Sequence, residues 1–181
     1  LVYQFLSLLN ADVRYFLPRR KEDGHGFNTE TIAAALQAAT PSLFIAVDCA
    51  MTGVEEIKEL KRRGIDTIIV DHHAPGAVLP DAVILNPKLE NNPFPFKDLA
   101  AVGVAYHFIE ALDAHFKTDG IYESLGVQAP NLVDYLDLVC LGTIADVMPL
   151  VNENRCFVSL GLDVIRKRRR SGIAALLSDL S

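Results

Sequence analysis

The sequence predicts an α/β fold, with a parallel sheet in its first half and mainly helices in its second half. Two apolar runs, residues 43–47 and 65–70, are short, rich in β-branched residues and continuous rather than alternating. Such runs are typical of strands that are buried on both faces of a parallel sheet. Helical sequence separates the two runs, and strands that alternate with helices of this length imply βαβ units with right-handed crossovers. We therefore predict parallel strands at 43–47 and 66–70.

Capping and turn signals divide the rest of the first half. Residues 1–6 have the pattern of part of a helix, and residues 13–17 have that of a strand closed by Pro18. Asn28 is a suitable N-cap for a helix over residues 30–39, which are rich in Ala.

A helix is also expected between the two strands, over residues 54–63, with Gly64 at its C′ position. Residues 83–85 form a further short predicted strand, which ends at Asn86. The segment 91–96 contains two Asn and two Pro residues and is the expected joint between the halves. The predicted helices of the second half lie at residues 99–116, 132–141 and 155–169.

Composition limits the classes of protein to consider. The chain has 181 residues, is 50% hydrophobic and carries a formal charge of −6, which fits one globular domain and gives no general attraction for nucleic acid. No apolar stretch approaches the roughly 20 residues that span a bilayer, so no membrane role is expected. The three cysteines are far apart and lack a CxxC pair, which argues against structural zinc and disulfides and predicts a cytoplasmic protein.

Metal-capable side chains follow both predicted strands. Asp48 ends the first run, and Asp71, His72 and His73 end the second. Because ligands bind at the carboxyl ends of parallel strands, these side chains are expected at one edge of one sheet. Carboxylates and imidazoles without thiolate suit Mn²⁺ or Mg²⁺, with Zn²⁺ or Co²⁺ as alternatives. The structural alternatives are a helix cap at Asp48 and a turn at Asp71; Cys49 is expected to be a small buried residue rather than a nucleophile.

A further carboxylate and two basic clusters are candidates for the same chemistry. Asp146 lies within the apolar run 141–150, where a buried charge would need a metal, a salt bridge or an N-cap role. Arg19 and Arg20 lie in a Gly-containing loop and are expected to contact phosphate. The basic segment 166–170 is expected to be a solvated helix end.

Several of these segments resemble motifs of the DHH phosphoesterase superfamily. They are Val47-Asp48, Val70-Asp71-His72-His73 and the segment 142–150. The match is closest to the RecJ-type single-stranded-DNA-specific exonucleases and covers essentially the whole chain. Further segments in the same order are Pro18-Arg19-Arg20 with residues 22–26, Asn86-Pro87, residues 99–105 and Asn154-Arg155.

The resemblance implies roles for individual residues. Asp48 would be the metal-bridging carboxylate, with His72 and Asp146 as further metal ligands. His73 would face the scissile phosphate, and Asp71 would support the cluster from behind. The residues implied in substrate binding are Arg19, Arg20, Asn86 and Arg155. Two departures from the family pattern are Cys49-Ala50, where Asn-Gly or Cys-Gly is commoner, and His25, where Tyr is usual.

The resemblance also implies an activity. A Rossmann-like DHH domain with two Mn²⁺ or Mg²⁺ ions would degrade single-stranded DNA from the 5′ end in repair and recombination and release nucleoside 5′-monophosphates. Single-strand-binding proteins and helicases are its implied partners. The alternatives are a small-oligonucleotide phosphodiesterase, a pyrophosphatase or a non-catalytic scaffold in replication.

The resemblance further implies that residues 1–181 are a single DHH catalytic-core domain truncated at both ends. The family's Asp-x-Asp-x-Asp-Gly motif would precede Leu1, and a DHHA1 domain would follow the core. These residues alone are therefore expected to be weakly active or inactive.

Overall fold

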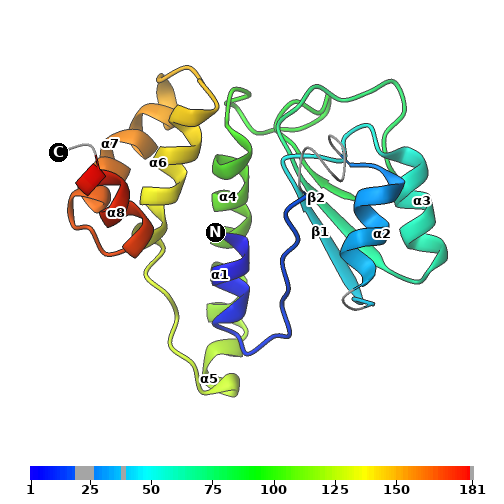
Figure 1. The fold of residues 1–181 in the computed structure, drawn as a ribbon, viewed down its shortest axis with the longest axis horizontal. Coiled ribbons are helices and arrows are strands. Elements are labelled where there is room, and N and C mark those ends of the chain that lie inside the picture. The colour runs from blue at the N-terminus through cyan, green and yellow to red at the C-terminus, as the bar shows by residue number, and fades with distance from the viewer. Residues whose placement is uncertain (19–26, 38–39, 180–181) are drawn as a thin grey trace. The chain divides into compact units, whose positions relative to one another are not determined.

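The structure, a computed structural model, describes residues 1–18, 27–37 and 40–179 (Figure 1). The chain forms two compact units. One unit is Ala11–Lys97, and the other combines Leu1–Asn10 with Asp98–Ser181. The first holds the sheet, and the second is helical.

The sheet unit contains three parallel strands in the order β1-β2-β3. They are β1 (Leu43–Val47), β2 (Asp66–Val70) and β3 (Val83–Leu85). Val47 pairs with Val70, and Val70 pairs with Leu85, so the carboxyl ends of all three strands are level. The three predicted strands and the predicted α/β class are confirmed.

Burial differs between the two longer strands. Ile69 and Val70 of the central strand β2 are fully buried, as the continuous apolar pattern predicts. Leu43 and Val47 of β1 are 43% and 40% exposed. The expectation that both strands are buried on both faces is therefore wrong for β1, which lies at an edge of the described sheet.

Two helices belong to the sheet unit, α2 (Thr29–Gln37) and α3 (Val54–Arg62). Asn28 caps α2 as predicted, because its Oδ1 accepts the Thr31 N–H at 2.8 Å and Thr31 Oγ1 accepts the Asn28 N–H at 3.1 Å. Gly64 follows the end of α3 with φ +73°, the conformation expected at C′. One apolar core joins helices and strands: Ile32, Ala46, Ala50, Met51, Ile57, Leu60, Ile65 and Ile69.

The predicted strand at residues 13–17 is wrong. These residues belong to no strand ladder among the described residues, and Tyr15 and Leu17 are 68% and 76% exposed. Local β propensity reflects packing on a pleated surface, and no described strand pairs with this segment to provide one.

The helical unit contains six α-helices and one 3-10 helix in the described ranges. They are α1 (Val2–Ser7), α4 (Ala101–Thr118), α5 (Ile121–Leu125), η1 (Leu132–Tyr135), α6 (Leu136–Ala145), α7 (Asn152–Arg166) and α8 (Ser171–Asp179). The three predicted helices of this half are confirmed, with each end shifted by two to four residues. None of the described helices is both long and apolar enough to cross a membrane.

Helices α6 and α7 make a close contact at Gly161. A Cβ added there would overlap the Leu136 carbonyl oxygen and the Cys140 Cβ. Gly161 thus allows the backbones to approach, which a larger residue would prevent without a shift.

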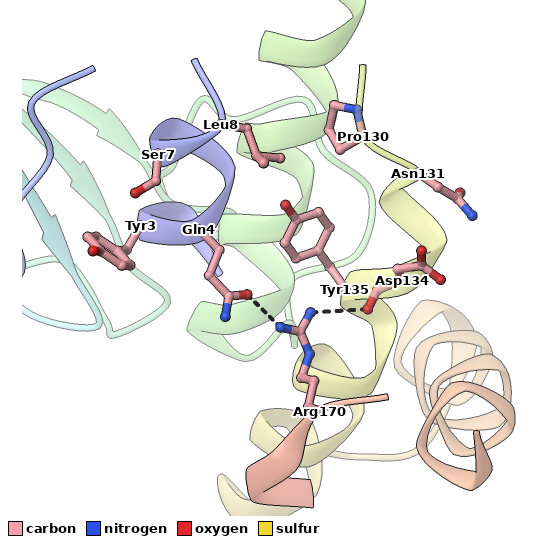
Figure 2. Close-up of a pocket in the computed structure, with 9 residues that line it drawn as sticks. All are labelled: Tyr3, Gln4, Ser7, Leu8, Pro130, Asn131, Asp134, Tyr135 and Arg170. Atoms are coloured by element: carbon pink, nitrogen blue, oxygen red, sulfur yellow. Dashed lines mark hydrogen bonds between the residues drawn. The ribbon is translucent and has the colours of Figure 1, made fainter. Parts of the chain in front are cut away.

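Arg170 connects three elements of the helical unit (Figure 2). Its Nε donates to the buried Asp137 carboxylate at 2.7 Å, and its other nitrogens donate to Gln4 Oε1 at 2.7 Å and to the Asp134 carbonyl at 3.2 Å. The guanidinium also lies 5.6 Å from the centre of the Tyr135 ring. This end of the basic segment is therefore structural rather than only solvated.

Candidate metal centre

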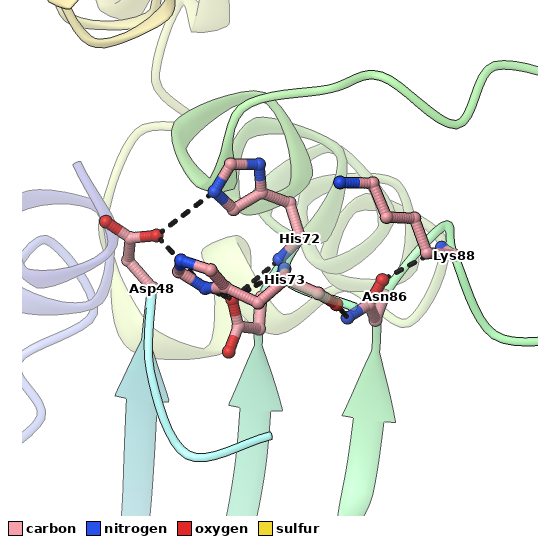
Figure 3. Close-up of polar contacts among 6 residues, drawn as sticks. Asp48, His72, His73, Asn86 and Lys88 are labelled. Carbon is pink, nitrogen blue, oxygen red and sulfur yellow. Dashed lines mark hydrogen bonds and ion pairs between the residues drawn. The ribbon is translucent and has the colours of Figure 1, made fainter. Parts of the chain in front are cut away.

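The parallel register places two strand ends side by side at the candidate centre. Asp48 directly follows β1, and its N–H donates to the Val70 carbonyl at 2.9 Å. Asp71 directly follows β2, and its N–H donates to the Leu85 carbonyl at 3.0 Å. The residues after the three strands therefore gather at one edge of the sheet (Figure 3).

Asp48, His72 and His73 form the metal-capable cluster of the described residues. Asp48 Oδ1 lies 3.4 Å from His72 Nε2 and 3.9 Å from His73 Nδ1. One ligand atom from each residue lies within 4.8 Å of the others. The His72 side chain is 8% exposed, whereas Asp48 and His73 are each 58% exposed. The cluster is thus anchored on one side and open to a ligand on the other.

Asp71 fixes the orientation of the histidines from behind. Its side chain is 1% exposed, and Oδ1 accepts hydrogen bonds from the His72 N–H at 2.7 Å and the His73 N–H at 3.1 Å. The same oxygen lies 2.7 Å from His73 Nδ1. Because an ionised carboxylate only accepts, this contact favours the arrangement with a hydrogen on Nδ1, and it leaves Nε2 directed away from Asp71.

This donor set fits a divalent cation. With His73 Nδ1 committed to Asp71, the Asp48 carboxylate and His72 Nε2 are the pair that lies together with both ligand atoms facing each other. Asp71 Oδ2 is buried and has no hydrogen-bond partner among the described residues, as is common beside an ion or an ordered water. Oxygen and imidazole donors without thiolate suit Mn²⁺ and Mg²⁺.

The loop after β1 has an unusual backbone. Asp48 and Ala50 have φ values of 62° and 82°, in the left-handed region. Asp tolerates this region, but Ala has a Cβ that makes it costly. Ala50 is nevertheless 4% exposed and belongs to the apolar core. The turn at Cys49-Ala50 is therefore held by packing of Ala50 in the apolar core.

Cys49 between them is not a nucleophile. Burial, followed by the charges of Asp71 and Asp48, raises the pKa of the Cys49 thiol to about 11. In the metal-free protein, the thiol therefore stays protonated at neutral pH. The prediction of a small buried residue is met only in part, because Cys49 is half-buried and packs against the edge of the apolar core.

Asn86, after β3, holds the His73 turn. Its side chain is buried, and Nδ2 donates to the His73 carbonyl at 2.9 Å while Oδ1 accepts the Lys88 N–H at 2.8 Å. In this structure, both ends of the Asn86 amide bind backbone groups of neighbouring loops. The predicted direct contact of Asn86 with a substrate stays a prediction. Lys88 was not predicted to take part in the site, although a cation three residues after the end of β3 was the available signal.

Asp146 and Arg155 belong to the helical unit. Asp146 lies just beyond α6, is exposed, and its N–H donates to the Gly142 carbonyl at 2.9 Å. The expectation of a carboxylate buried in an apolar run is therefore wrong, because the helix ends there and Val147 is 87% exposed. Arg155 is exposed in the first turn of α7. Their roles as ligand and phosphate contact stay predictions.

The buried side chain of Asn154 holds the segment between Asp146 and Arg155. Asn154 Nδ2 donates to the Asp98 carbonyl at 2.6 Å and to the Pro149 carbonyl at 3.0 Å. It thereby fixes the loop before α7. The predicted phosphate contacts Arg19 and Arg20 lie outside the described residues.

Known proteins resemble this chain in sequence and fold. The single-stranded-DNA-specific exonuclease RecJ of Dickeya dadantii is 42% identical over 173 residues, which are 94% of this chain and 30% of the relative. RecJ of Bacillus subtilis is 39% identical over 173 residues, which are 95% of this chain and 20% of the relative. The chain thus spans less than a third of these curated relatives.

Two solved RecJ structures have folds similar to that of this chain. A crystal structure of exonuclease RecJ bound to manganese matches with a TM-score of 0.80 at 34% identity, over 99% of this chain and 43% of that one. RecJ from Thermus thermophilus in complex with Mn²⁺ matches with a TM-score of 0.73 at 32% identity, over 98% of this chain and 24% of that one. The family model described as the DHH family, N-terminal domain, matches residues 1–143. The predicted resemblance is confirmed, and the chain belongs to the DHH family.

Proposed function

We propose that this chain is the central part of the catalytic core of a RecJ-type exonuclease. The enzyme hydrolyses single-stranded DNA from its 5′ end with Mn²⁺ or Mg²⁺ and releases nucleoside 5′-monophosphates in repair and recombination. The observation that carries the proposal is the 3.4 Å approach of Asp48 to His72 beside the Asp71–His73 pair. The names of the relatives, which specify single-stranded DNA, support the substrate.

Asp48 and His72 would hold a divalent ion, and Asp146 is proposed as a further ligand. When bound, such an ion neutralises charge on a phosphodiester and makes water more acidic. The manganese in two solved relatives supports this choice of ion. The family resemblance implies two ions.

His73 would act on the substrate side of the centre. Its Nδ1 hydrogen is held by Asp71, so its Nε2 lone pair can take a proton or, once protonated, donate to a phosphate oxygen. Its exposure of 58% leaves the ring accessible to a strand. Arg19, Arg20 and Arg155 are proposed to contact other phosphates.

The proposal also includes binding partners and a cellular location. Single-stranded DNA is the proposed partner, together with single-strand-binding proteins and helicases. Cys49, Cys140 and Cys156 are free thiols, which supports a cytoplasmic location.

The test uses the full-length protein with Mn²⁺ and four substrates: 5′-labelled and 3′-labelled oligothymidylate, a blunt duplex and inorganic pyrophosphate. We expect loss of the single strands with 5′-mononucleotides as products, released first from the 5′ end. Asp48→Asn should abolish this activity, and the matched control Asp12→Asn, at an exposed carboxylate of the same unit, should not.

Other outcomes assign other functions. Hydrolysis of pyrophosphate without strand cleavage would make the protein a pyrophosphatase. Strand binding without any hydrolysis would make it a scaffold. Either result contradicts the proposal.

A further inference from the structure

The third strand end brings a cation to the metal centre. Lys88 follows β3, after Asn86 and Pro87. Since β3 pairs in parallel with β2 and Leu85 lies opposite Val70, Lys88 starts from the same edge of the sheet as the histidines.

A single side chain joins Lys88 to the His73 turn. The buried Asn86 amide donates to the His73 carbonyl at 2.9 Å and accepts the Lys88 N–H at 2.8 Å. The Asn86 carbonyl in turn accepts from Asn92 Nδ2 at 2.9 Å. Because Asn86 is 1% exposed and bonded at both ends of its amide, the backbone of Lys88 is held in a defined place relative to the histidines.

The Lys88 side chain extends toward the centre. Figure 3 shows it running from the loop after β3 toward His72, beyond the ends of the strands where Asp48 and both imidazoles lie. No ion pair joins its ammonium to a carboxylate of the described residues. By contrast, the ammonium groups of Lys58 and Lys117 pair with Glu55 and Asp113, each at 2.6 Å.

We infer that Lys88 contacts a phosphate of the strand that is hydrolysed at this centre. The chain carries a formal charge of −6, and Asp48 and Asp71 add negative charge at the site, so a polyanion needs local cations to approach. An ammonium on a flexible stem binds phosphate as a point charge and tolerates different strand positions. Lys88 therefore helps to bind the strand, while the Asp48–His72 pair and His73 serve the chemistry. This role rests on the proposed function.

The test compares three variants of the full-length protein: Lys88→Gln, Lys88→Arg and the control Lys58→Gln on α3. Cleavage of 5′-labelled oligothymidylate is measured with Mn²⁺ over a series of salt concentrations, together with the melting temperature and the Mn²⁺ concentration for half-maximal activity. These readouts separate strand binding from metal binding and from folding.

We expect Lys88→Gln to raise KM roughly threefold to fivefold, as for one exposed charge contact. The slope of log kcat/KM against log salt should fall by about 0.7, the value for one phosphate of a single strand. The kcat, the melting temperature and the Mn²⁺ requirement should stay unchanged. Lys88→Arg should keep most of the wild-type KM because it keeps the charge.

Two results would overturn the inference and leave the proposed function standing. One is a Lys88→Gln enzyme whose KM and salt slope equal those of Lys58→Gln. The other is a loss of melting temperature in both Lys88 variants, which would make the side chain structural. A wild-type protein that cleaves no single-stranded DNA would instead overturn the proposed function, and this role with it.

Discussion

The buried carboxylate of Asp71 holds the exposed imidazole of His73 through a 2.7 Å contact between Oδ1 and Nδ1. The same oxygen accepts the backbone N–H groups of His72 and His73. One atom thus fixes the turn, the ring and the position of the ring hydrogen. Asp71 thus orients the His73 ring from behind the proposed metal centre.

Replacing Asp71 by Asn should therefore impair turnover more than metal binding. The amide removes the charge and weakens the hold on His73, and we expect kcat to fall about 10–100-fold, as for other supporting residues of metal sites. Steady-state cleavage of single-stranded DNA and a Mn²⁺ titration measure the two effects. Asp66→Asn, at the opposite end of β2, is the control. A loss of Mn²⁺ affinity as large as the loss of kcat would make Asp71 a ligand instead.

Ala50→Gly tests the left-handed backbone beside Asp48. The change removes a buried methyl, worth about 0.8 kcal/mol, and adds about 0.5–1 kcal/mol of backbone entropy cost, but it relieves about 1–2 kcal/mol of strain. We expect an almost unchanged free energy of unfolding. Ala46→Gly is the control. It removes the methyl of a residue in β1 that is 3% exposed and has no positive φ, so this change relieves no backbone strain.

The Ala46 variant should therefore be less stable than the Ala50 variant by about 1–2 kcal/mol in urea titrations. Equal losses of stability in the two variants would show that the turn at Ala50 carries no strain.

Gly161→Ala tests the contact between α6 and α7. The added methyl meets the Leu136 carbonyl oxygen and Cys140, so we expect a loss of about 2–3 kcal/mol of unfolding free energy. Gly172→Ala in α8 is the matched control, because a Cβ there meets nothing within 4 Å. The control should be neutral or slightly stabilising, by up to about 1 kcal/mol. A Gly161 variant as stable as the control would mean that the two helices do not approach as described.

Cys49 should resist thiol reagents in the metal-free protein. Because its pKa is raised to about 11, mainly by burial, little thiolate forms near neutral pH, whereas Cys156 is exposed. Mass spectrometry after iodoacetamide treatment should show Cys156 modified first and Cys49 only as the pH approaches about 11. Urea should abolish the difference.

The same shift predicts a loss of stability at high pH. The unfolded thiol ionises from its ordinary pKa of 9.0, whereas the folded thiol ionises only near 11. The contribution to folding is thus complete below 9.0 and is lost as pH rises toward 11. Equal labelling of Cys49 and Cys156 at neutral pH would contradict both statements.

Local patterns were sufficient to predict the part of the site that lies on the sheet. Residues 43–47 and 68–70 are continuously apolar, and the parallel pairing of the two strands brings Asp48 and His72 to the same edge of the sheet. Asn28 and Gly64 were equally readable, because capping is a property of the residue and its neighbours.

Features that depend on tertiary contacts could not be predicted. Residues 13–17 have β propensity but lack a paired strand among the described residues, and the apolar run around Asp146 turns out to be a helix end with exposed side chains. The residue type of Ala50 gives no indication of its positive φ; the only hint was the Gly that is commoner at this position in the family pattern. The position of the Lys88 backbone depends on two hydrogen bonds of the buried Asn86.

A Mn²⁺ titration of the wild-type protein and of His72→Gln tests the central claim most directly. Free Mn²⁺ is measured by electron paramagnetic resonance, and His115→Gln, at an exposed histidine of α4, is the control. We expect wild type and control to bind Mn²⁺ alike, and His72→Gln to lose affinity by more than about tenfold together with its single-strand cleavage. Unchanged Mn²⁺ affinity and stoichiometry in His72→Gln would show that the strand-end cluster does not hold the metal.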